Sequence, residues 1–336
     1  MLTMKITGER WPTRSPFRIS GYTFTDCEVL VAELSHQGIR GRGEAAGVYY
    51  HGETVSSMTE QIEQVRPVIE AGLTRQGLRA LLPPGGARCA LDCALWDLEA
   101  KLSDVPAFRS AGLETLRPLE TTYTVGAGSP EEMAATAATY TSARRLKIKL
   151  TGQDDEARLR AVRAAKPDVW IGIDANQGLT RRSLEALLPV LVELDVQLIE
   201  QPLPVGRDED LRGLDSPLPL AADESVQSLP DIARMQGIYQ VINIKLDKCG
   251  GLTEALEMAR EVRRLGMRPM VGCMQGTALA IAPACVVGAL CEIVDLDAPT
   301  FLTNDREPPA VYRDGTVACP PDWGFPLPSQ SKKVTA

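Results

Sequence analysis

Hydrophobic and polar residues alternate along the first part of the chain. The segments Tyr22–Thr25 and Glu28–Leu34 show this period of two, which is typical of antiparallel strands with one face in water. Apolar residues then recur at helical spacing from about Ser56 to Gln76 and from Ala87 to Lys101, which predicts two helices. We therefore expect an α+β domain that ends near residue 118.

From there on, short apolar runs recur, and each is followed by a helix-like segment. The eight runs are Thr121–Val125, Arg145–Leu150, Trp170–Asp174, Gln197–Glu200, Leu218–Ala222, Val241–Lys245, Met270–Cys273 and Cys291–Asp295. The polar residues that end the second to sixth runs follow one another at intervals of 25, 26, 23 and 22 residues. A strand–helix repeat of this length requires a parallel sheet, and eight strands favour a closed barrel. No GxGxxG or GxxxxGK motif follows the first strand, which disfavours a nucleotide-binding sheet.

The predicted fold class is α/β with two domains. The α+β domain covers residues 1–118 and the barrel covers residues 119–310, while a turn-rich tail, 311–336, is expected to return to the first domain. The uncharged stretch from Pro269 to Cys291 is long enough to span a bilayer, but prolines and glycines interrupt it. We expect a buried strand, a glycine turn and a buried helix there, and no membrane partner.

Composition narrows the classes of partner. The 336 residues are 44% hydrophobic and 24% charged, with a net charge of −8 and no Lys/Arg runs; this is a folded globular chain for which nucleic acid is disfavoured as a partner. The eight cysteines form no CxxC pair, and the only histidines are His36 and His51, which excludes a zinc finger or a His-rich metal centre. Reduced cysteines and the lack of a signal-peptide pattern lead us to expect a cytoplasmic protein.

Charged residues occupy the predicted C-terminal ends of six barrel strands, where functional residues of parallel barrels cluster. They are Lys147 and Lys149, Asp174, Glu200, Asp223 and Glu224, Lys245, and Asp295 and Asp297. Charged groups are normally expelled from apolar strand ends. Their convergence on one end of the barrel therefore predicts a functional site.

Three carboxylates from successive strands, Asp174, Glu200 and Asp223, form an oxygen-rich set. Each one alone is more simply interpreted as a solvated residue at the start of a loop. Three at matching positions favour a site for one hard divalent cation, and Mg²⁺ suits this ligand set.

Lys147 and Lys149 lie two apart on one strand, so their side chains point the same way. Packing two ammonium groups together predicts that the pKa of at least one is lowered. Lys245 lies four strands further on, roughly across the barrel. Strand-end lysines usually extend to water, but Lys149 and Lys245 each stand between apolar neighbours. Two facing lysines predict 1,1-proton transfer, in which a proton leaves one face and returns to the other while the metal and ammonium groups stabilise an enediolate.

Asp295 and Asp297 share one face of the last strand. A carboxylate pair there suits a substrate ammonium group. For either aspartate alone, capping of the next helix is an equally good interpretation.

These residues resemble the enolase superfamily, in its muconate-lactonising subgroup, and within it the dipeptide epimerases. The resemblance rests on segments spread over nearly the whole chain: ARCALDCALWDLEAK, RLKIKL, IDANQG, IEQP, AADES, NIKLDKCGG, GCMQGT and DLDAP. It implies a capping α+β domain over a modified TIM barrel, (β/α)7β, in agreement with the division above. Enolase-superfamily sites use a Lys or His base with Mg²⁺.

The resemblance also implies roles for the site residues. The two acid/base residues would be Lys149 and Lys245. The ligands of one Mg²⁺ per subunit would be Asp174, Glu200 and Asp223. Lys147 would hold the substrate carboxylate, and Asp295 and Asp297 would hold the α-ammonium group of a dipeptide.

One loop departs from the family pattern. Relatives that act on L-Ala-D/L-Glu often carry an arginine in a stretch like FRISRG, whereas Gly21 follows Ser20 here, with Tyr22 and Phe24 beyond it and Tyr50 in a second loop. Packing at the domain interface is the simpler interpretation of each aromatic residue. If they line the pocket, an apolar or aromatic second residue fits better than glutamate.

The expected activity is therefore Mg²⁺-dependent epimerisation of the C-terminal residue of an L-Ala-D/L-Xaa dipeptide. Alternatives from the same superfamily are an N-acylamino acid racemase, an o-succinylbenzoate synthase and a muconate cycloisomerase, which have no need of an ammonium clamp. A non-catalytic peptide-binding barrel is a remote alternative, because it predicts loss of one paired base and this chain retains both. A homo-oligomer, and a place in murein-peptide recycling or in peptide catabolism, are compatible with the sequence.

Overall fold

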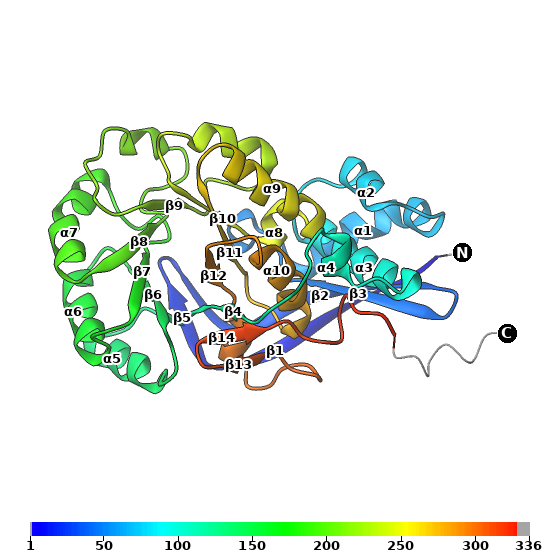
Figure 1. Cartoon of the computed structure of the whole chain (residues 1–336), viewed down its shortest axis with the longest axis horizontal. Helices are drawn as coiled ribbons and strands as arrows, with labels where there is room; N and C mark the ends of the chain where they lie inside the picture. Colours follow the sequence, from blue (N-terminus) through cyan, green and yellow to red (C-terminus); the bar gives the residue numbers. More distant parts are fainter. Residues whose placement is uncertain (1, 328–336) are drawn as a thin grey trace.

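The computed structural model describes residues 2–327 (Figure 1). The N-terminal domain is built on a three-stranded antiparallel sheet of β1 (Thr3–Ile19), β2 (Tyr22–His36) and β3 (Ile39–Ala45), in that order. A long hairpin joins β1 and β2, with Phe17 opposite Phe24 near its tip. The predicted antiparallel pairing of β2 is confirmed, but the predicted alternation is wrong from Val29 to Ala32, where four successive residues are buried because helices contact this central strand.

Four helices pack beside this sheet. They are α1 (Val55–Glu70), α2 (Arg75–Leu81), α3 (Gly86–Ser103) and α4 (Ala107–Ser110). The expectation of one helix from Ser56 to Gln76 is wrong, because the chain turns at Gly72 in the left-handed region and Thr74 then caps α2 by accepting the N–H of Gly77. The expected helix from Ala87 to Lys101 is confirmed by α3.

Two glycines of β3 let α3 lie directly on the strand. A Cβ on Gly43 would stand 2.1 Å from the Ala90 carbonyl oxygen and 2.6 Å from the Ala94 nitrogen. We expect Gly43→Ala to lower the free energy of unfolding by about 1–3 kcal/mol, because helix and strand backbones would have to separate. Urea unfolding measures this loss. The matched control is Gly77→Ala, whose new methyl group meets only the flexible side chains of Leu73 and Thr74; equal stability of the two variants would contradict the prediction.

The second domain is an eight-stranded parallel sheet in the order β12-β11-β10-β9-β8-β7-β6-β5. Its strands are β5 (Thr122–Val125), β6 (Arg145–Lys149), β7 (Trp170–Asp174), β8 (Val196–Glu200), β9 (Leu220–Ala222), β10 (Val241–Ile244), β11 (Arg268–Gly272) and β12 (Ile293–Asp295). β12 packs beside β5, and the N–H of Leu296 donates to the Thr121 hydroxyl at 2.9 Å. The sheet thus curves into a nearly closed TIM-type barrel, as predicted.

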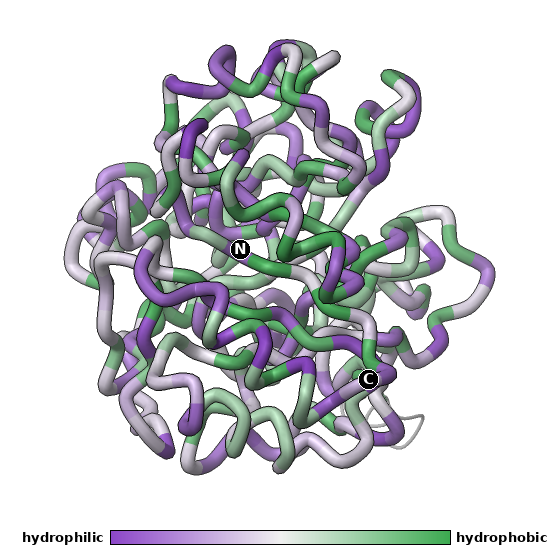
Figure 2. Tube along the Cα trace, turned by 90° about the vertical axis from the view of Figure 1, so that its left-hand side faces the viewer, coloured by the Kyte–Doolittle hydropathy of each residue, from purple (hydrophilic) through white to green (hydrophobic). Residues whose placement is uncertain are grey.

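Helices cover the outside of the barrel (Figure 1). They are α5 (Pro130–Thr139), α6 (Asp155–Ala165), α7 (Arg181–Glu193), α9 (Leu252–Arg264) and α10 (Ala278–Gly288). The short helix α8 (Leu246–Cys249) follows β10 and packs against α3 of the first domain. Shorter 3₁₀ helices are η1 (Tyr49–His51) in the first domain and η2 (Asp208–Leu211), η3 (Leu229–Met235) and η4 (Ala298–Phe301) in the second. Figure 2 shows the hydrophobic segments running through the middle of the molecule.

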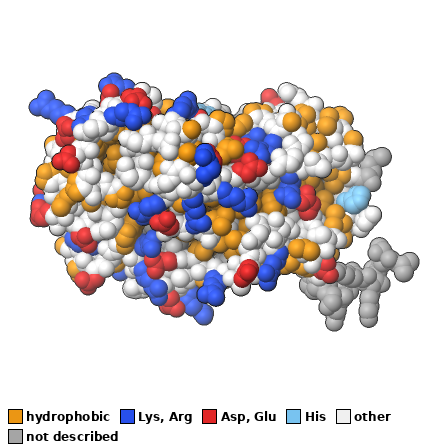
Figure 3. All heavy atoms as spheres, turned by 45° about the horizontal axis from the view of Figure 1, so that its top comes forward, with side chains coloured by type: hydrophobic (Ala, Val, Ile, Leu, Met, Phe, Trp, Pro, Cys, Tyr) orange, Lys and Arg blue, Asp and Glu red, His pale blue; other side chains and the backbone are white. Residues whose placement is uncertain are grey.

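The uncharged stretch folds as expected, with β11 leading through a glycine-containing turn into the buried helix α10. None of the helices between residues 2 and 327 has the length and hydropathy needed to cross a bilayer. On the face shown in Figure 3, basic and acidic side chains are interspersed, so its charge is mixed in sign.

A separate apolar cluster fills the barrel interior, away from the C-terminal ends of the strands. Its buried members are Leu198, Ala221, Val241, Met270 and Ile293, with Trp170 packed against them. Each is the first or the middle residue of its strand, and none is at the C-terminal end. This cluster therefore fills the barrel interior away from the C-terminal ends of the strands. The C-terminal end of the barrel is left open to hold a functional site.

The C-terminal segment contacts both domains. β13 (Val311–Arg313) and β14 (Thr316–Ala318) form a hairpin, and β14 pairs with β4 (Leu119–Glu120) at the start of the barrel. The chain then reaches the first domain, where the buried indole of Trp323 donates to the carbonyl oxygens of Arg42 at 2.9 Å and Cys93 at 3.1 Å. Residues 328–336 of the predicted tail lie outside the described residues.

Candidate active site

A cavity of about 280 Å³ lies between the C-terminal end of the barrel and the β1–β2 hairpin. Its charged lining includes Lys147, Lys149, Lys245, Asp295 and Asp297, and the first domain contributes Phe17, Phe24 and Tyr49 among others. We call the first domain the capping domain from here on, because it covers this cavity.

The three predicted metal ligands converge at the barrel end. Asp174 ends β7 and Glu200 ends β8, where the two residues are directly paired, and Asp223 follows β9. All three are buried, and one carboxylate oxygen of each lies within 4.8 Å of the others. Because oxygen ligands from three carboxylates suit a hard cation, this group has the donor set and spacing of a metal site.

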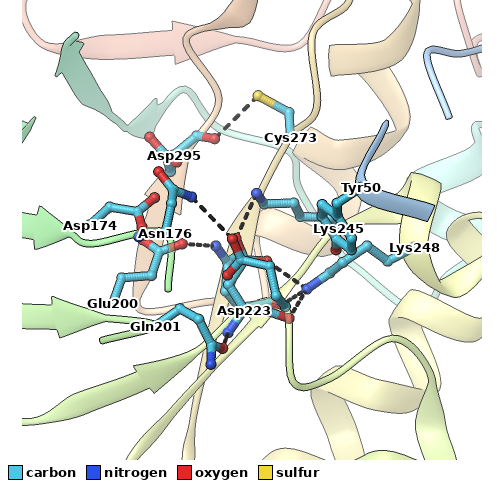
Figure 4. Close-up of polar contacts among 12 residues, drawn as sticks. Tyr50, Asp174, Asn176, Glu200, Gln201, Asp223, Lys245, Lys248, Cys273 and Asp295 are labelled. Carbon is cyan, nitrogen blue, oxygen red and sulfur yellow. Dashed lines mark hydrogen bonds and ion pairs between the residues drawn. The ribbon is translucent and has the colours of Figure 1, made fainter. Parts of the chain in front are cut away.

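The predicted lysines surround these carboxylates, as Figure 4 shows for Lys245. Lys149 Nζ lies 2.5 Å from Asp174, and Lys245 Nζ lies 2.8 Å from Asp223. Lys149 is on β6 and Lys245 follows β10, so they approach the cavity from well-separated strands. The structure therefore brings together the two lysines predicted to act on opposite faces.

Three further polar side chains tie the site together, and the sequence reasoning did not single them out. The Asn176 side chain accepts from Lys149 at 3.1 Å. Asn243 donates to Glu200 at 2.6 Å. Lys248, fully buried, donates to the Asp223 carboxylate at 2.6 Å (Figure 4).

A signal for these residues was present in the sequence. They stand within the motifs IDANQG and NIKLDKCGG. In these motifs, roles were assigned only to the metal ligand Asp174 and the lysine Lys245. A polar residue two or three places from a predicted metal ligand or catalytic lysine was the available sign.

Asp295 and Asp297 occupy different surroundings, although both belong to the predicted ammonium clamp. Asp295 contacts Lys147 and the Thr122 hydroxyl. Asp297 instead accepts the backbone N–H of Thr124 at 2.5 Å. Asp297 has no ion pair among the described residues, so it is the better placed of the two to meet a positive group in the cavity.

Comparison with known proteins agrees with this geometry. A family model described as enolase C-terminal domain-like matches residues 131–327. Another, described as the N-terminal domain of mandelate racemase / muconate lactonizing enzyme, matches residues 1–109. The chain belongs to the enolase superfamily.

Two curated relatives of this superfamily member are isomerases. An L-Ala-D/L-Glu epimerase from Escherichia coli strain K12 is 40% identical over 319 residues, which cover 94% of this chain and 99% of the relative. An N-acetyl-D-glutamate racemase from a Pseudoalteromonas species is 37% identical over 294 residues, which cover 86% and 92%.

Among solved structures, an enolase family member from Agrobacterium tumefaciens is similar throughout. It is 44% identical with a TM-score of 0.94, and the match covers 96% of this chain and 100% of that chain. That protein is described as having homology to dipeptide epimerases and as containing sodium and L-Ala-L-Glu.

The aromatic residues of this enolase-superfamily chain divide into two groups. Phe24 and Tyr49 line the cavity, with their ring centroids 5.2 Å apart. Tyr22 stands at the hairpin tip, is 44% exposed and packs against Tyr49 from outside the lining. Tyr50 also lies outside the lining, because η1 turns its hydroxyl toward Gln227. Of the three predicted aromatic contacts, the structure thus places Phe24 in the cavity wall.

The pKa is raised at Lys147, one of the two paired lysines for which a lowered value was expected, and also at Lys245. Burial alone would lower both values, but Asp295 beside Lys147 and Asp223 beside Lys245 raise each pKa well above its ordinary value. Sequence reasoning considered the neighbouring ammonium groups and omitted the carboxylates that surround them.

The metal-site carboxylates differ in how readily they ionise. Burial raises the pKa of Glu200 to about 8, and Asp174 adds to this shift. Burial also disfavours charge on Asp223, but Lys245 and Lys248 more than offset it and hold that pKa well below its ordinary value. A bound cation favours the ionised form of every ligand, so it would make the three carboxylates alike.

Proposed function

We propose that this protein is a dipeptide epimerase that inverts the α-carbon of the C-terminal residue. The observation that carries the proposal is the placement of Lys149 and Lys245 on separate sides of one cavity, beside the group Asp174, Glu200 and Asp223. A proton removed by one lysine is replaced from the opposite face by the other, which inverts the carbon without any net change in composition.

The remaining lining residues hold the two ends of the substrate. The ammonium group of Lys147 lies 3.4 Å from Glu200, one of the three carboxylates of the metal group (Asp174, Glu200 and Asp223). This position suits it to bind the substrate carboxylate. Asp297 suits the α-ammonium group, since its charge is not paired within the described residues. The reacting carbon then lies between these two ends, within reach of both catalytic lysines.

We infer that the cation is one Mg²⁺. Asp174, Glu200 and Asp223 would hold it, because three carboxylate oxygens within 4.8 Å of one another match a small, hard cation that keeps sites for water and substrate. The ion supplies positive charge beside the substrate carboxylate, which stabilises the negative charge that develops when the α-proton leaves.

The cavity wall favours an apolar or aromatic C-terminal side chain over glutamate. Among the described lining residues, the only cations are Lys147, Lys149 and Lys245, and all three already have a role. The lining also includes Phe17 and Phe301, packed at a centroid distance of 4.6 Å, and the acidic Asp26 and Glu28. A glutamate side chain there would meet no unassigned positive group, whereas an apolar one would be desolvated at no electrostatic cost.

Deuterium uptake in D₂O with Mg²⁺, followed by mass spectrometry, tests the proposal. The substrates are two series of dipeptides, L-Ala-L-Xaa and L-Xaa-L-Glu. Uptake of one deuteron in the C-terminal residue is expected, with L-Ala-L-Phe and L-Ala-L-Leu exchanging faster than L-Ala-L-Glu. No uptake in any dipeptide would contradict the function, and fastest uptake in L-Ala-L-Glu would contradict the side-chain preference.

N-acylamino acid racemisation is the second candidate. The 37% identity to an N-acetyl-D-glutamate racemase favours it, and it uses the same lysines and carboxylates without an ammonium clamp. Including N-acetyl-L-amino acids in the deuterium experiment separates the two functions.

Asp297→Asn is expected to raise KM for free dipeptides about 10–100-fold, because a hydrogen bond between charged groups contributes about 1.5–3 kcal/mol. Steady-state kinetics on L-Ala-L-Phe measures the change. N-acetyl-L-phenylalanine, which carries no ammonium group, serves as the control substrate.

The same carboxylate predicts a pH dependence. Burial, with Asp295 nearby, raises the pKa of Asp297 to about 7, so the group is neutral in more acidic solution and loses its attraction for a cation. We therefore expect kcat/KM for the free dipeptide to fall as the pH decreases below 7, and this acidic limb to be absent in Asp297→Asn. An unchanged KM together with an unchanged pH profile would argue against the clamp.

A further inference from the structure

Helix α8 carries charged side chains to different parts of the molecule. Lys245 precedes the helix and pairs with Asp223 in the cavity, and Lys248 donates to the carboxylate and the carbonyl oxygen of the same aspartate. Asp247 lies between these two lysines, but its carboxylate reaches the capping domain. In Figure 1, α8 lies between the barrel strand β10 and the capping helix α3.

Asp247 holds the beginning of a capping segment, residues 46–51, which includes η1. One carboxylate oxygen accepts the backbone N–H of Ala46 at 2.9 Å and that of Gly47 at 3.0 Å. Both residues line the cavity, as does Tyr49. Gly47 has a φ of +79° and turns the chain so that the two N–H groups converge.

The other end of this segment also rests on the barrel. The Tyr50 hydroxyl accepts from the Gln227 side chain at 3.1 Å, and Gln227 donates to the Glu224 carbonyl oxygen at 2.7 Å. Asp247 lies in α8, shortly after Lys245, and Gln227 lies in the loop that follows β9 and Asp223. The segment is therefore attached to the same part of the barrel that carries the chemistry.

Ionisation of Asp247 does not stabilise the folded protein. It forms no ion pair among the described residues, and burial raises its pKa to about 7, with Glu53 and Glu44 of the capping domain adding to the shift. A buried acid whose pKa is raised weakens the fold as it ionises. A carboxylate oxygen does, however, accept two N–H groups without presenting a donor of its own.

We propose that Asp247 is a positioning residue that docks segment 46–51 on the barrel beside Lys245, and thereby sets which side chains fit over the reacting carbon. The inference rests on the proposed function, because it assigns this segment to the C-terminal side chain of the substrate. Since one short helix carries both Asp247 and the flanking Lys245, the segment and the lysine keep a fixed separation. Loss of the contact is expected to reduce discrimination between substrates.

The test compares Asp247→Leu with the unmodified protein on L-Ala-L-Phe and L-Ala-L-Ala. One carboxylate oxygen accepts both N–H groups, and an asparagine oxygen could replace it, whereas leucine is of similar size and offers no acceptor to Ala46 and Gly47. We expect KM for L-Ala-L-Phe to rise at least 10-fold, kcat to change less than 3-fold, and the ratio of kcat/KM between the two dipeptides to fall at least 10-fold. A ratio within 2-fold of the unmodified protein would overturn the specificity role.

Asp92→Leu is the matched control. Asp92 is another buried carboxylate at the domain interface, and it accepts the N–H of Thr253 at 2.9 Å and its hydroxyl at 2.5 Å, away from the cavity. This variant should lower the melting temperature and leave the kcat/KM ratio unchanged. If both variants change the ratio equally, Asp247 acts only through stability and the proposal fails.

Hydrogen exchange of segment 46–51, measured by mass spectrometry, decides the docking role without any substrate. Exchange should become at least 10-fold faster in Asp247→Leu and stay unchanged in Asp92→Leu; unchanged exchange in both would overturn the inference. Should Asp247→Leu not fold, Asp247→Glu, which keeps the charge and displaces the oxygens, takes its place. If the unmodified protein epimerises no dipeptide, the proposed function fails, and the exchange result still decides whether Asp247 docks the segment.

Discussion

Lys149→Ala and Lys245→Ala are each expected to lower the rate of epimerisation on the order of 10⁴-fold, near the upper end of what a single acid/base group contributes. Inversion in either direction needs one lysine to take the proton and the other to return one, so neither direction survives the loss of either residue. Both lysines are buried at the cavity and lie against a metal-group carboxylate. Chiral chromatography of the product mixture measures the loss.

Isotope exchange separates this mechanism from a general loss of structure. A variant that lacks the lysine on one face still removes the α-proton presented to the other face, so it should exchange one epimer of the dipeptide with D₂O and not the other. The two variants should have opposite preferences. Lys149→Met and Lys245→Met, which keep most of the side-chain volume, are the controls for packing. Full turnover by either alanine variant, or the same exchange preference in both, would refute the two-base mechanism.

Removal of divalent cations with a chelator is expected to reduce turnover at least about 10³-fold, because a metal ion beside a reacting carboxylate contributes several kcal/mol of charge stabilisation. Addition of Mg²⁺ should restore the activity, and Na⁺ at the same concentration serves as the control. Turnover that persists after elemental analysis shows a metal-free protein would contradict the metal's role.

The protein should remain folded after this treatment. Each metal-group carboxylate has a partner of its own: Lys149 for Asp174, Asn243 for Glu200 and Lys248 for Asp223. These contacts limit the cost of leaving three buried carboxylates without a cation. An unchanged circular dichroism spectrum in the chelator would show that the loss of turnover is chemical.

The strand-end residues could be predicted because a parallel barrel repeats. Once the spacing between Lys149, Asp174 and Glu200 was recognised as one strand and one helix, each residue had to lie at the same end of its strand. The metal group then followed from residue type alone. The eight strands were found within a few residues of their observed limits for the same reason.

The supporting contacts could not be predicted in this way, because no period governs the loops beyond a strand end. Asn176 has a φ of +40°, so its side-chain direction depends on one irregular turn. Asp247 reaches Ala46, about 200 positions away in the sequence, through the packing of two domains. The raised pKa of Lys147 was not predicted, because it depends on all the surrounding charges at once.

The position of Trp323 affects the order in which the two domains can complete folding. Its indole is buried in the capping domain against Arg42 and Cys93, although it follows the whole barrel in sequence. A nascent chain emerges from its N-terminus and tends to fold domain by domain. In this protein the core of the capping domain includes Trp323, which is synthesised after the barrel. The capping domain can therefore complete its core only after the barrel has emerged from the ribosome.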